Sequence, residues 1–297
     1  MASLAASASL SGADRPNLYA AETPVRIGKV TLVVRNLPLV AGFYEKVIGL
    51  SPVTSVPGRV ALGAGGRPLL ELVEDKAAAP SSPRAAGLFH TAFLVPTRKD
   101  LARWLLHVAG IGARIQGASD HIVSEAIYLA DPEGNGIEVY HDRAPQSWNW
   151  QGETVEMATD HLDLDDLVAG VQPGDWQGMP EGACVGHVHL RVGDIPAADA
   201  FYKDALGLGL TARYPGGSFF SSGRYHHHLA ANVWASRGAG PRPLPSTGLA
   251  ELELVARDAA AWEDLSERGR KAGATARPDG SLALEDPWRN VVVLRRG

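Results

Sequence analysis

Apolar and polar residues follow the same order in two distant parts of the chain. Residues 28–34 (GKVTLVV) open as a strand, and residues 41–50 (AGFYEKVIGL) carry apolar residues at helical spacing up to a glycine that can end a helix. Residues 186–192 (GHVHLRV) and 200–208 (AFYKDALGL) repeat this order. Because self-similarity at a fixed spacing indicates a repeated structural unit, we predict a tandem duplication.

Each half contains a second, fainter copy of the same unit. Residues 87–95 predict a strand with a helix after it at about 98–109, and residues 248–255 predict a strand with a helix at about 258–272. Short strands and an Asp-Pro turn follow both helices. We therefore expect an α+β protein made of four βαβββ modules, which start near residues 26, 87, 185 and 248.

The length of 297 residues suits two domains, each large enough to bury a core. The predicted division is a flexible N-terminal arm at 1–22, a first two-module domain at 23–143, a linker at 144–183 and a second two-module domain at 184–297.

Composition narrows the class of protein. Hydrophobic residues make up 45% and charged residues 21%, with a net charge of −5, which is ordinary for a soluble globular protein and favours neither nucleic acid nor a membrane surface as partner. The one cysteine, Cys184, excludes an internal disulfide and a cysteine-based metal site and fits a cytoplasmic location. No segment has the apolar length needed to span a bilayer.

The stretch at 119–140, SDHIVSEAIYLADPEGNGIEVY, is the most informative about chemistry. It predicts a strand, a tight Asp-Pro-Glu-Gly-Asn-Gly turn and a second strand. His121 is a potential acid or base, and Tyr128 offers a phenol. Glu138 stands in an apolar strand, where an unpaired carboxylate would be costly. A plain β-turn-β unit with a buried, hydrogen-bonded glutamate is the alternative interpretation.

The spacing of His121, Tyr128, Asp131-Pro132 and Glu138 resembles the signature of the extradiol ring-cleaving dioxygenases. These enzymes belong to the vicinal-oxygen-chelate family, together with glyoxalases and bleomycin-resistance proteins. One position departs, because Ser119 stands where the signature has Gly, Asn, Thr, Ile or Val. Over residues 26–296 the resemblance implies paired modules that form cupped sheets around a ligand. It also implies that Glu138 binds iron and that His121 and Tyr128 assist catalysis.

In this family the metal ligands come from the first and last strands of the modules. Aligned by the repeat, the first-strand positions here are Lys29, His90, His187 and Glu251. The last-strand positions are Glu71, Glu138, one of His226, His227 and His228, and a hydrophobe near Val293. An extradiol iron site needs two histidines and one carboxylate, with open positions for catecholate and dioxygen.

Each half carries only part of the catalytic machinery that the resemblance implies. The first half offers Glu71, His90 and Glu138, because a protonated Lys29 is a poor ligand. The second half offers two histidines and one carboxylate, for which we select His187, His228 and Glu251. The first half has the signature tyrosine, and the second half lacks it.

Two further arrangements stay open. His187 completes a set with His90 and Glu138 if modules two and three face each other, although the usual pairing within each half argues against this. Alternatively, Lys29 forms a buried salt bridge with Glu71 or Glu138 in place of a lost metal.

The resemblance implies a metal-dependent extradiol dioxygenase, which inserts both atoms of dioxygen into the ring of a small aromatic diol. The metal that it implies is Fe(II), with Mn, Zn or Ni as alternatives. A glyoxalase-like metal-dependent isomerase or lyase and a metal-free small-molecule-binding protein are the alternative functions. The sequence leaves open whether the protein is a homo-oligomer.

Overall fold

A computed structural model describes residues 19–297. Of the predicted N-terminal arm, 1–22, residues 1–18 lie outside the described residues. Its last four residues form a short helix, α1 (Tyr19–Glu22), in which Ala20 is buried. The hydroxyl of Tyr19 donates to the carbonyl oxygen of Gly223 (2.6 Å). This part of the arm is therefore docked on the fold rather than loose.

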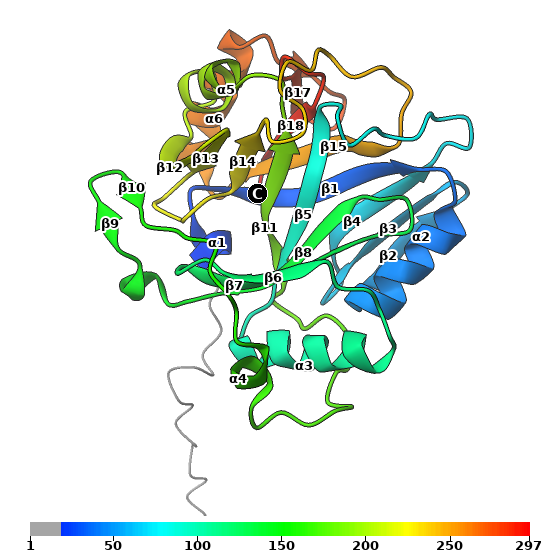
Figure 1. Cartoon of the computed structure of the whole chain (residues 1–297). Helices are drawn as coiled ribbons and strands as arrows, with labels where there is room; N and C mark the ends of the chain where they lie inside the picture. Colours follow the sequence, from blue (N-terminus) through cyan, green and yellow to red (C-terminus); the bar gives the residue numbers. More distant parts are fainter. Residues whose placement is uncertain (1–18) are drawn as a thin grey trace, which may run out of the picture.

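The described residues contain the four predicted βαβββ modules (Figure 1). Module one consists of β1 (Val25–Val34), α2 (Leu37–Phe43), β2 (Ser51–Val56), β3 (Arg59–Ala64) and β4 (Arg67–Glu74). Module two consists of β5 (Gly87–Leu94), α3 (Arg98–Gly110), β6 (Gly117–Asp120), β7 (Ser124–Ala130) and β8 (Gly136–Asp142). The linker holds β9 (Trp150–Gln151), β10 (Thr154–Val155) and α4 (Leu164–Val168).

The second half repeats this order. Module three consists of β11 (Cys184–Arg191), α5 (Ile195–Asp199), β12 (Gly209–Tyr214), β13 (Gly217–Ser221) and β14 (Leu229–Asn232). Module four consists of β15 (Gly248–Ala256), α6 (Ala259–Lys271), β16 (Thr275–Ala276), β17 (Leu282–Glu285) and β18 (Val291–Arg296). The helices of modules one and three continue into π-helical turns, Tyr44–Ile48 and Ala200–Ala205.

Local chemistry explains where the helices begin and end. The side chain of Thr97 accepts a hydrogen bond from the backbone of Asp100, whose carboxylate accepts one from the backbone of Thr97, so a capping box starts α3. In module one the helix ends at Gly49, whose φ of 85° lies in the left-handed region that glycine adopts without strain. Each of the two long helices packs on strands of its own module.

The modules join into two eight-stranded sheets, which confirms the α+β prediction. One sheet has the order β16-β17-β18-β15-β1-β4-β3-β2, and the other has β12-β13-β14-β11-β5-β8-β7-β6. In each sheet the first strands of two modules pair in an antiparallel manner at the centre, β1 with β15 and β5 with β11.

The pairing crosses the two halves of the chain. Modules one and four share one sheet, and modules two and three share the other, so each sheet draws on both 23–143 and 184–297. The expectation that modules pair within each half is corrected by these strand orders. The repeat could not reveal this, because every module offers the same kind of free first-strand edge. Below, the sheet of modules two and three is called the histidine sheet, and that of modules one and four the ion-pair sheet.

Alternation along the strands separates a core face from an open face. In β11, Val188 and Leu190 join the main hydrophobic core, whereas His187, His189 and Arg191 point to the opposite face. Polar side chains thus gather in the hollow of the sheet. Within residues 19–297, no helix combines the length and hydrophobicity needed to cross a membrane.

Candidate metal centre

Three side chains of the histidine sheet converge in its hollow. Nε2 of His90 lies 3.0 Å from Oε2 of Glu138, and Nε2 of His187 lies 3.2 Å from the same oxygen. The two imidazole nitrogens are 3.4 Å apart. One donor atom from each residue lies within 4.8 Å of the others, and all three residues are buried. In the part of the chain that the structure describes, this is the one such group.

Strand pairing explains why these residues meet. Ala92 of β5 pairs with Glu138 of β8 on one side and with His187 of β11 on the other. Its methyl side chain leaves space between them, and His90 stands two residues earlier on the same strand. At Gly136, β8 lies so close to β5 that an added Cβ would stand 2.0 Å from the carbonyl oxygen of Phe89.

The protonation states suit a metal. Burial lowers the pKa of His187, which favours a neutral imidazole. Burial alone would raise the pKa of Glu138, but the interactions with His187 and His90 hold it well below its ordinary value. Two imidazoles and one ionised carboxylate with open space beside them form the donor set that non-haem Fe(II) takes in proteins, so the residues fit such an ion.

His121 and Tyr128 form a hydrogen-bonded pair beside this group. Nδ1 of His121 donates a hydrogen bond to the carbonyl oxygen of Ala158 (2.6 Å). In this neutral tautomer Nε2 carries the lone pair, which accepts a hydrogen bond from the hydroxyl of Tyr128 (2.6 Å). Tyr128 of β7 pairs with Glu138 of β8 across the sheet. Burial and the Glu138 carboxylate raise the pKa of Tyr128 well above its ordinary value, so the phenol stays protonated.

A strained turn presents His121. The next residue, Ile122, has a φ of 69°, which is unfavourable for a β-branched side chain. Asp120 holds the turn, because its carboxylate accepts from the backbone of Ile122 (2.9 Å) and pairs with Arg143. Strain of this kind is found where a side chain must be aimed at a site.

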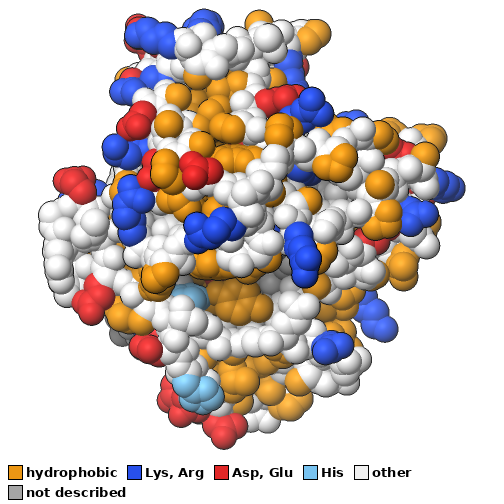
Figure 2. Space-filling model, turned by 45° about the horizontal axis from the view of Figure 1, so that its top comes forward, with side chains coloured by type: hydrophobic (Ala, Val, Ile, Leu, Met, Phe, Trp, Pro, Cys, Tyr) orange, Lys and Arg blue, Asp and Glu red, His pale blue; other side chains and the backbone are white. Residues whose placement is uncertain are grey.

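The group lines a cavity of about 450 Å³ together with His121 and Tyr128. Hydrophobic side chains supply most of the remaining wall, and Figure 2 shows on one face of the molecule a hollow lined by hydrophobic side chains with a histidine beside it. Further lining residues are Phe89, His189, Arg191, His227 and Trp234. His189 could be identified from its spacing of two to His187, whereas nothing in the sequence marks Phe89 or Trp234 as wall residues.

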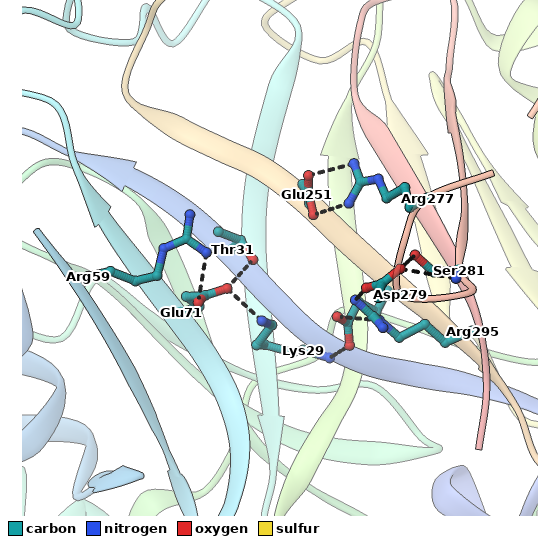
Figure 3. Close-up of polar contacts among 10 residues, drawn as sticks. Lys29, Thr31, Arg59, Glu71, Glu251, Arg277, Asp279, Ser281 and Arg295 are labelled. Carbon is teal, nitrogen blue, oxygen red and sulfur yellow. Dashed lines mark hydrogen bonds and ion pairs between the residues drawn. The ribbon is translucent and has the colours of Figure 1, made fainter. Parts of the chain in front are cut away.

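His228 and Glu251 lie apart from the group. Nε2 of His228 lies 3.1 Å from Oγ1 of Thr23, and burial lowers the pKa of His228 to about 3. Glu251 belongs to the ion-pair sheet and forms two hydrogen bonds with Arg277 (2.7 and 3.0 Å; Figure 3). The second-half set selected from the sequence, which combined these residues with His187, is therefore not assembled.

The reason is a misalignment of the repeat. Strand β14 begins at Leu229, after the histidine run. In module one, Thr31 of β1 pairs with Glu71 of β4, which is the last-strand position. The corresponding pair in module three is His189 of β11 with Ala230 of β14. Ala230, and not a histidine, therefore stands at the last-strand position of module three. The irregular segment before β14 breaks the spacing on which the alignment relied.

The family model described as "Glyoxalase/Bleomycin resistance protein/Dioxygenase superfamily" matches residues 26–139 and 185–294. The chain belongs to this superfamily. Within it, the chain is 35% identical over 267 residues to catechol-2,3-dioxygenase of Bacillus subtilis. The matched stretch covers 88% of this chain and 93% of that relative. A shorter match, 30% identity over 149 residues, covers 46% of this chain and 70% of biphenyl-2,3-diol 1,2-dioxygenase 3 of Rhodococcus globerulus.

The fold has solved counterparts in the superfamily. Glyoxalase I from Zea mays superposes with a TM-score of 0.56 at 16% identity, over 93% of this chain and 94% of that one. At this identity the likeness concerns the fold alone. The family model and the 35% identity to the Bacillus subtilis relative confirm, at the level of the superfamily, the resemblance inferred from the sequence.

Proposed function

We propose that the protein is an extradiol dioxygenase that opens the ring of a catechol beside its two hydroxyls. The observation that carries the proposal is the meeting of His90, Glu138 and His187 in one cavity with the His121–Tyr128 pair against them. The superfamily and the 35% identity to a catechol-2,3-dioxygenase support it.

His90, Glu138 and His187 would hold the metal, for which we propose Fe(II). When bound, this ion supplies a Lewis acid for the two diol oxygens and a redox partner for dioxygen. A set of two neutral imidazoles and one carboxylate leaves a divalent ion with net positive charge, which favours an anionic diol. This donor set therefore suits catecholate and dioxygen as the two small-molecule partners.

The protein's own residues manage the protons. The protonated phenol of Tyr128 now donates its hydrogen bond to Nε2 of His121, and the hydroxyl can turn to donate to a diol oxygen instead. Nε2 of His121 then becomes free to accept a proton from the substrate. Nδ1 stays committed to the carbonyl of Ala158, which fixes both the ring orientation and the tautomer.

The test is oxygen uptake by protein reconstituted with Fe(II) without air and then given a catechol. We expect one dioxygen consumed per catechol, with both atoms of ¹⁸O₂ recovered in the ring-opened product. Tyr128→Phe should lower kcat by about 100-fold or more, as loss of a general acid-base partner does. His161→Gln, at an exposed linker histidine, is the matched control and should leave kcat unchanged.

One result would replace the proposal by the glyoxalase-like alternative. That result is stoichiometric metal binding with no oxygen consumption for any catechol, accompanied by isomerisation of a substrate that can form an enediolate.

A further inference from the structure

Three side chains of β11 form a line that leaves the candidate metal centre. His187, His189 and Arg191 alternate with core residues and all line the same cavity. Because a strand rises by about 3.3 Å per residue, the backbone of Arg191 lies roughly 13 Å from that of His187. The cavity therefore has a metal-ligand end and an arginine end.

Aromatic side chains form a platform between these ends. Phe89 lies 4.9 Å from His189 and 5.6 Å from Trp234, and Trp234 lies 5.2 Å from His189, measured between ring centroids. The register between β5 and β11 shifts between His189 and Leu190, so Phe89 has no pairing partner on β11. Such a β-bulge changes the direction in which a side chain points. Phe89 and Trp234 remain 37% and 51% exposed, so they offer open apolar surface to a ligand.

Arg191 brings a charge that the surrounding residues leave uncompensated. It is the one arginine or lysine that lines the cavity, and it makes no ion pair among the residues 19–297. Its Nε is buried without a hydrogen-bond partner, and its one side-chain hydrogen bond in the described residues is from Nη2 to Oγ of Ser81, at 3.5 Å. The single carboxylate of the wall, Glu138, belongs to the opposite end.

A second arginine strengthens the positive potential at this end. Arg242 is buried, packs over Gly87 at the start of β5, and also has a buried Nε without a partner. Gly87 pairs with Arg191 across the sheet. Burial and the charge of Arg242 lower the pKa of Arg191. Arg242 itself donates to the carbonyl oxygen of Arg289 and lies near Asp286 and Glu285, whereas Arg191 alone faces the cavity. An anion bound in the cavity would offset the repulsion that Arg242 exerts on Arg191 and accept hydrogen bonds from the Arg191 guanidinium.

We propose that the substrate is a catechol whose ring carries an apolar arm ending in a carboxylate, and that Arg191 binds this carboxylate while Phe89 and Trp234 support the arm. The proposal rests on the proposed function for the catechol part. The aromatic platform favours an arm that is apolar along its length, and the planar guanidinium matches the two oxygens of a carboxylate.

The experiment compares a dihydroxyphenyl alkanoic acid with its primary amide, which has nearly the same shape without the charge. With the wild-type enzyme we expect kcat/KM for the acid to exceed that for the amide by about 10- to 100-fold, the range for a hydrogen bond to a charged group. Arg191→Gln should remove this preference through KM, and Arg191→Lys should restore part of it. Arg268→Gln, on the outer helix α6, is the matched control and should keep the preference.

A binding measurement separates this inference from the proposed function. Calorimetry of metal-free protein with a phenyl alkanoic acid, which lacks the diol, should show binding to the wild type and about 10-fold weaker binding to Arg191→Gln. If this holds and no catechol is opened, the anion site stands and the dioxygenase proposal falls. Ring opening of acid and amide with equal kcat/KM, together with no change on Arg191→Gln, would overturn the inference and leave the dioxygenase proposal intact. Should Arg191→Gln fail to fold, the acid-to-amide ratio of the wild type and of Arg191→Lys decides.

Discussion

The two sheets have the same strand plan but opposite chemistry in their hollows. The first strands β11 and β1 correspond, and Lys29 stands in β1 where His187 stands in β11. Likewise, Glu251 in β15 corresponds to His90 in β5. In the histidine sheet, Ala92 of β5 pairs with Glu138 of β8. The corresponding pair in the ion-pair sheet is Glu253 of β15 with Val293 of β18, so a hydrophobic residue replaces the candidate carboxylate ligand. Every position of the candidate metal set is thus substituted in the ion-pair sheet.

The substitutions create a set of charges that neutralise each other (Figure 3). Nζ of Lys29 lies 2.5 Å from Glu71, which also pairs with Arg59 at 3.2 Å. Nearby, Arg277 pairs with Glu251, and Arg295 pairs with Glu253. In the histidine sheet the charge of Glu138 faces imidazoles and open space. In the ion-pair sheet the protein's own arginine and lysine side chains balance the buried carboxylates, whereas in the histidine sheet the same fold leaves a candidate place for an added cation.

The strongest test of this difference is a pair of substitutions at corresponding positions. His90→Ala should lower the affinity for Fe(II) by at least ~100-fold, because the variant loses a side chain that would bind the metal directly. Loss of a residue that only supports a ligand already costs up to about 100-fold in metal affinity. Glu251→Ala should leave affinity within about twofold. Iron content after dialysis and the gain in Tm on adding metal give the readouts, since a ligand bound by the native state raises stability. Equal loss in both variants would show that the sheets are not functionally distinct.

A smaller effect is expected when the lysine of the ion-pair sheet is removed. Lys29→Met should lower the free energy of unfolding by about 1–3 kcal/mol at pH 7, because Glu71 is buried and loses its nearest cation. Denaturant unfolding measures this, and the iron content should not change. An unfolding free energy equal to that of the wild type would show that Arg59 alone suffices for Glu71.

The same pair predicts a pH dependence. Burial would raise the pKa of Glu71, but Lys29 and Arg59 hold it below its ordinary value of 4.5. A lowered folded-state pKa gives stability that is fully present above the unfolded value and is lost as pH falls through the folded value. The difference between wild type and Glu71→Gln should therefore be constant above about pH 5 and shrink below about pH 4.5.

The smallest effect concerns the more exposed pair. Arg277→Gln should change the free energy of unfolding by about 0–1 kcal/mol, because Arg277 and Glu251 are each about one third exposed and solvent screens their attraction. Loss of more than about 2 kcal/mol would mean that this pair is as important as the one between Lys29 and Glu71. Wild type and variant are compared by thermal unfolding at low and high salt.

The sequence was informative where structure is local and silent where it depends on partners. Helices α3 and α6 coincide with the predicted ones within one or two residues, because their apolar spacing is regular. Of the two salt bridges that the sequence offers to Lys29, the one with Glu71 is formed, and the one with Glu138 is not, because Glu138 pairs with His90. Module pairing could not be predicted, because it depends on which equivalent edges meet after the chain has folded.

The same contrast holds at the candidate site. Strand positions identify His90, Glu138 and His187 as candidates, and their combination in one set is one of the arrangements that the sequence leaves open. Choosing that arrangement requires the knowledge that β5 and β11 are neighbours. The prediction of His228 depends on a count through an irregular segment, where spacing carries no information about the face on which a side chain lies.

The crossed pairing of the modules makes the candidate metal centre a property of the intact chain. His90 and His187 are 97 residues apart, and they meet only because β5 and β11 are neighbours. Each half, produced alone, would hold two unpaired central edges and an incomplete ligand set. A chain cut between β10 and α4 would therefore supply two fragments whose reassembly could be followed by the return of iron binding, with the metal serving as a reporter of complementation.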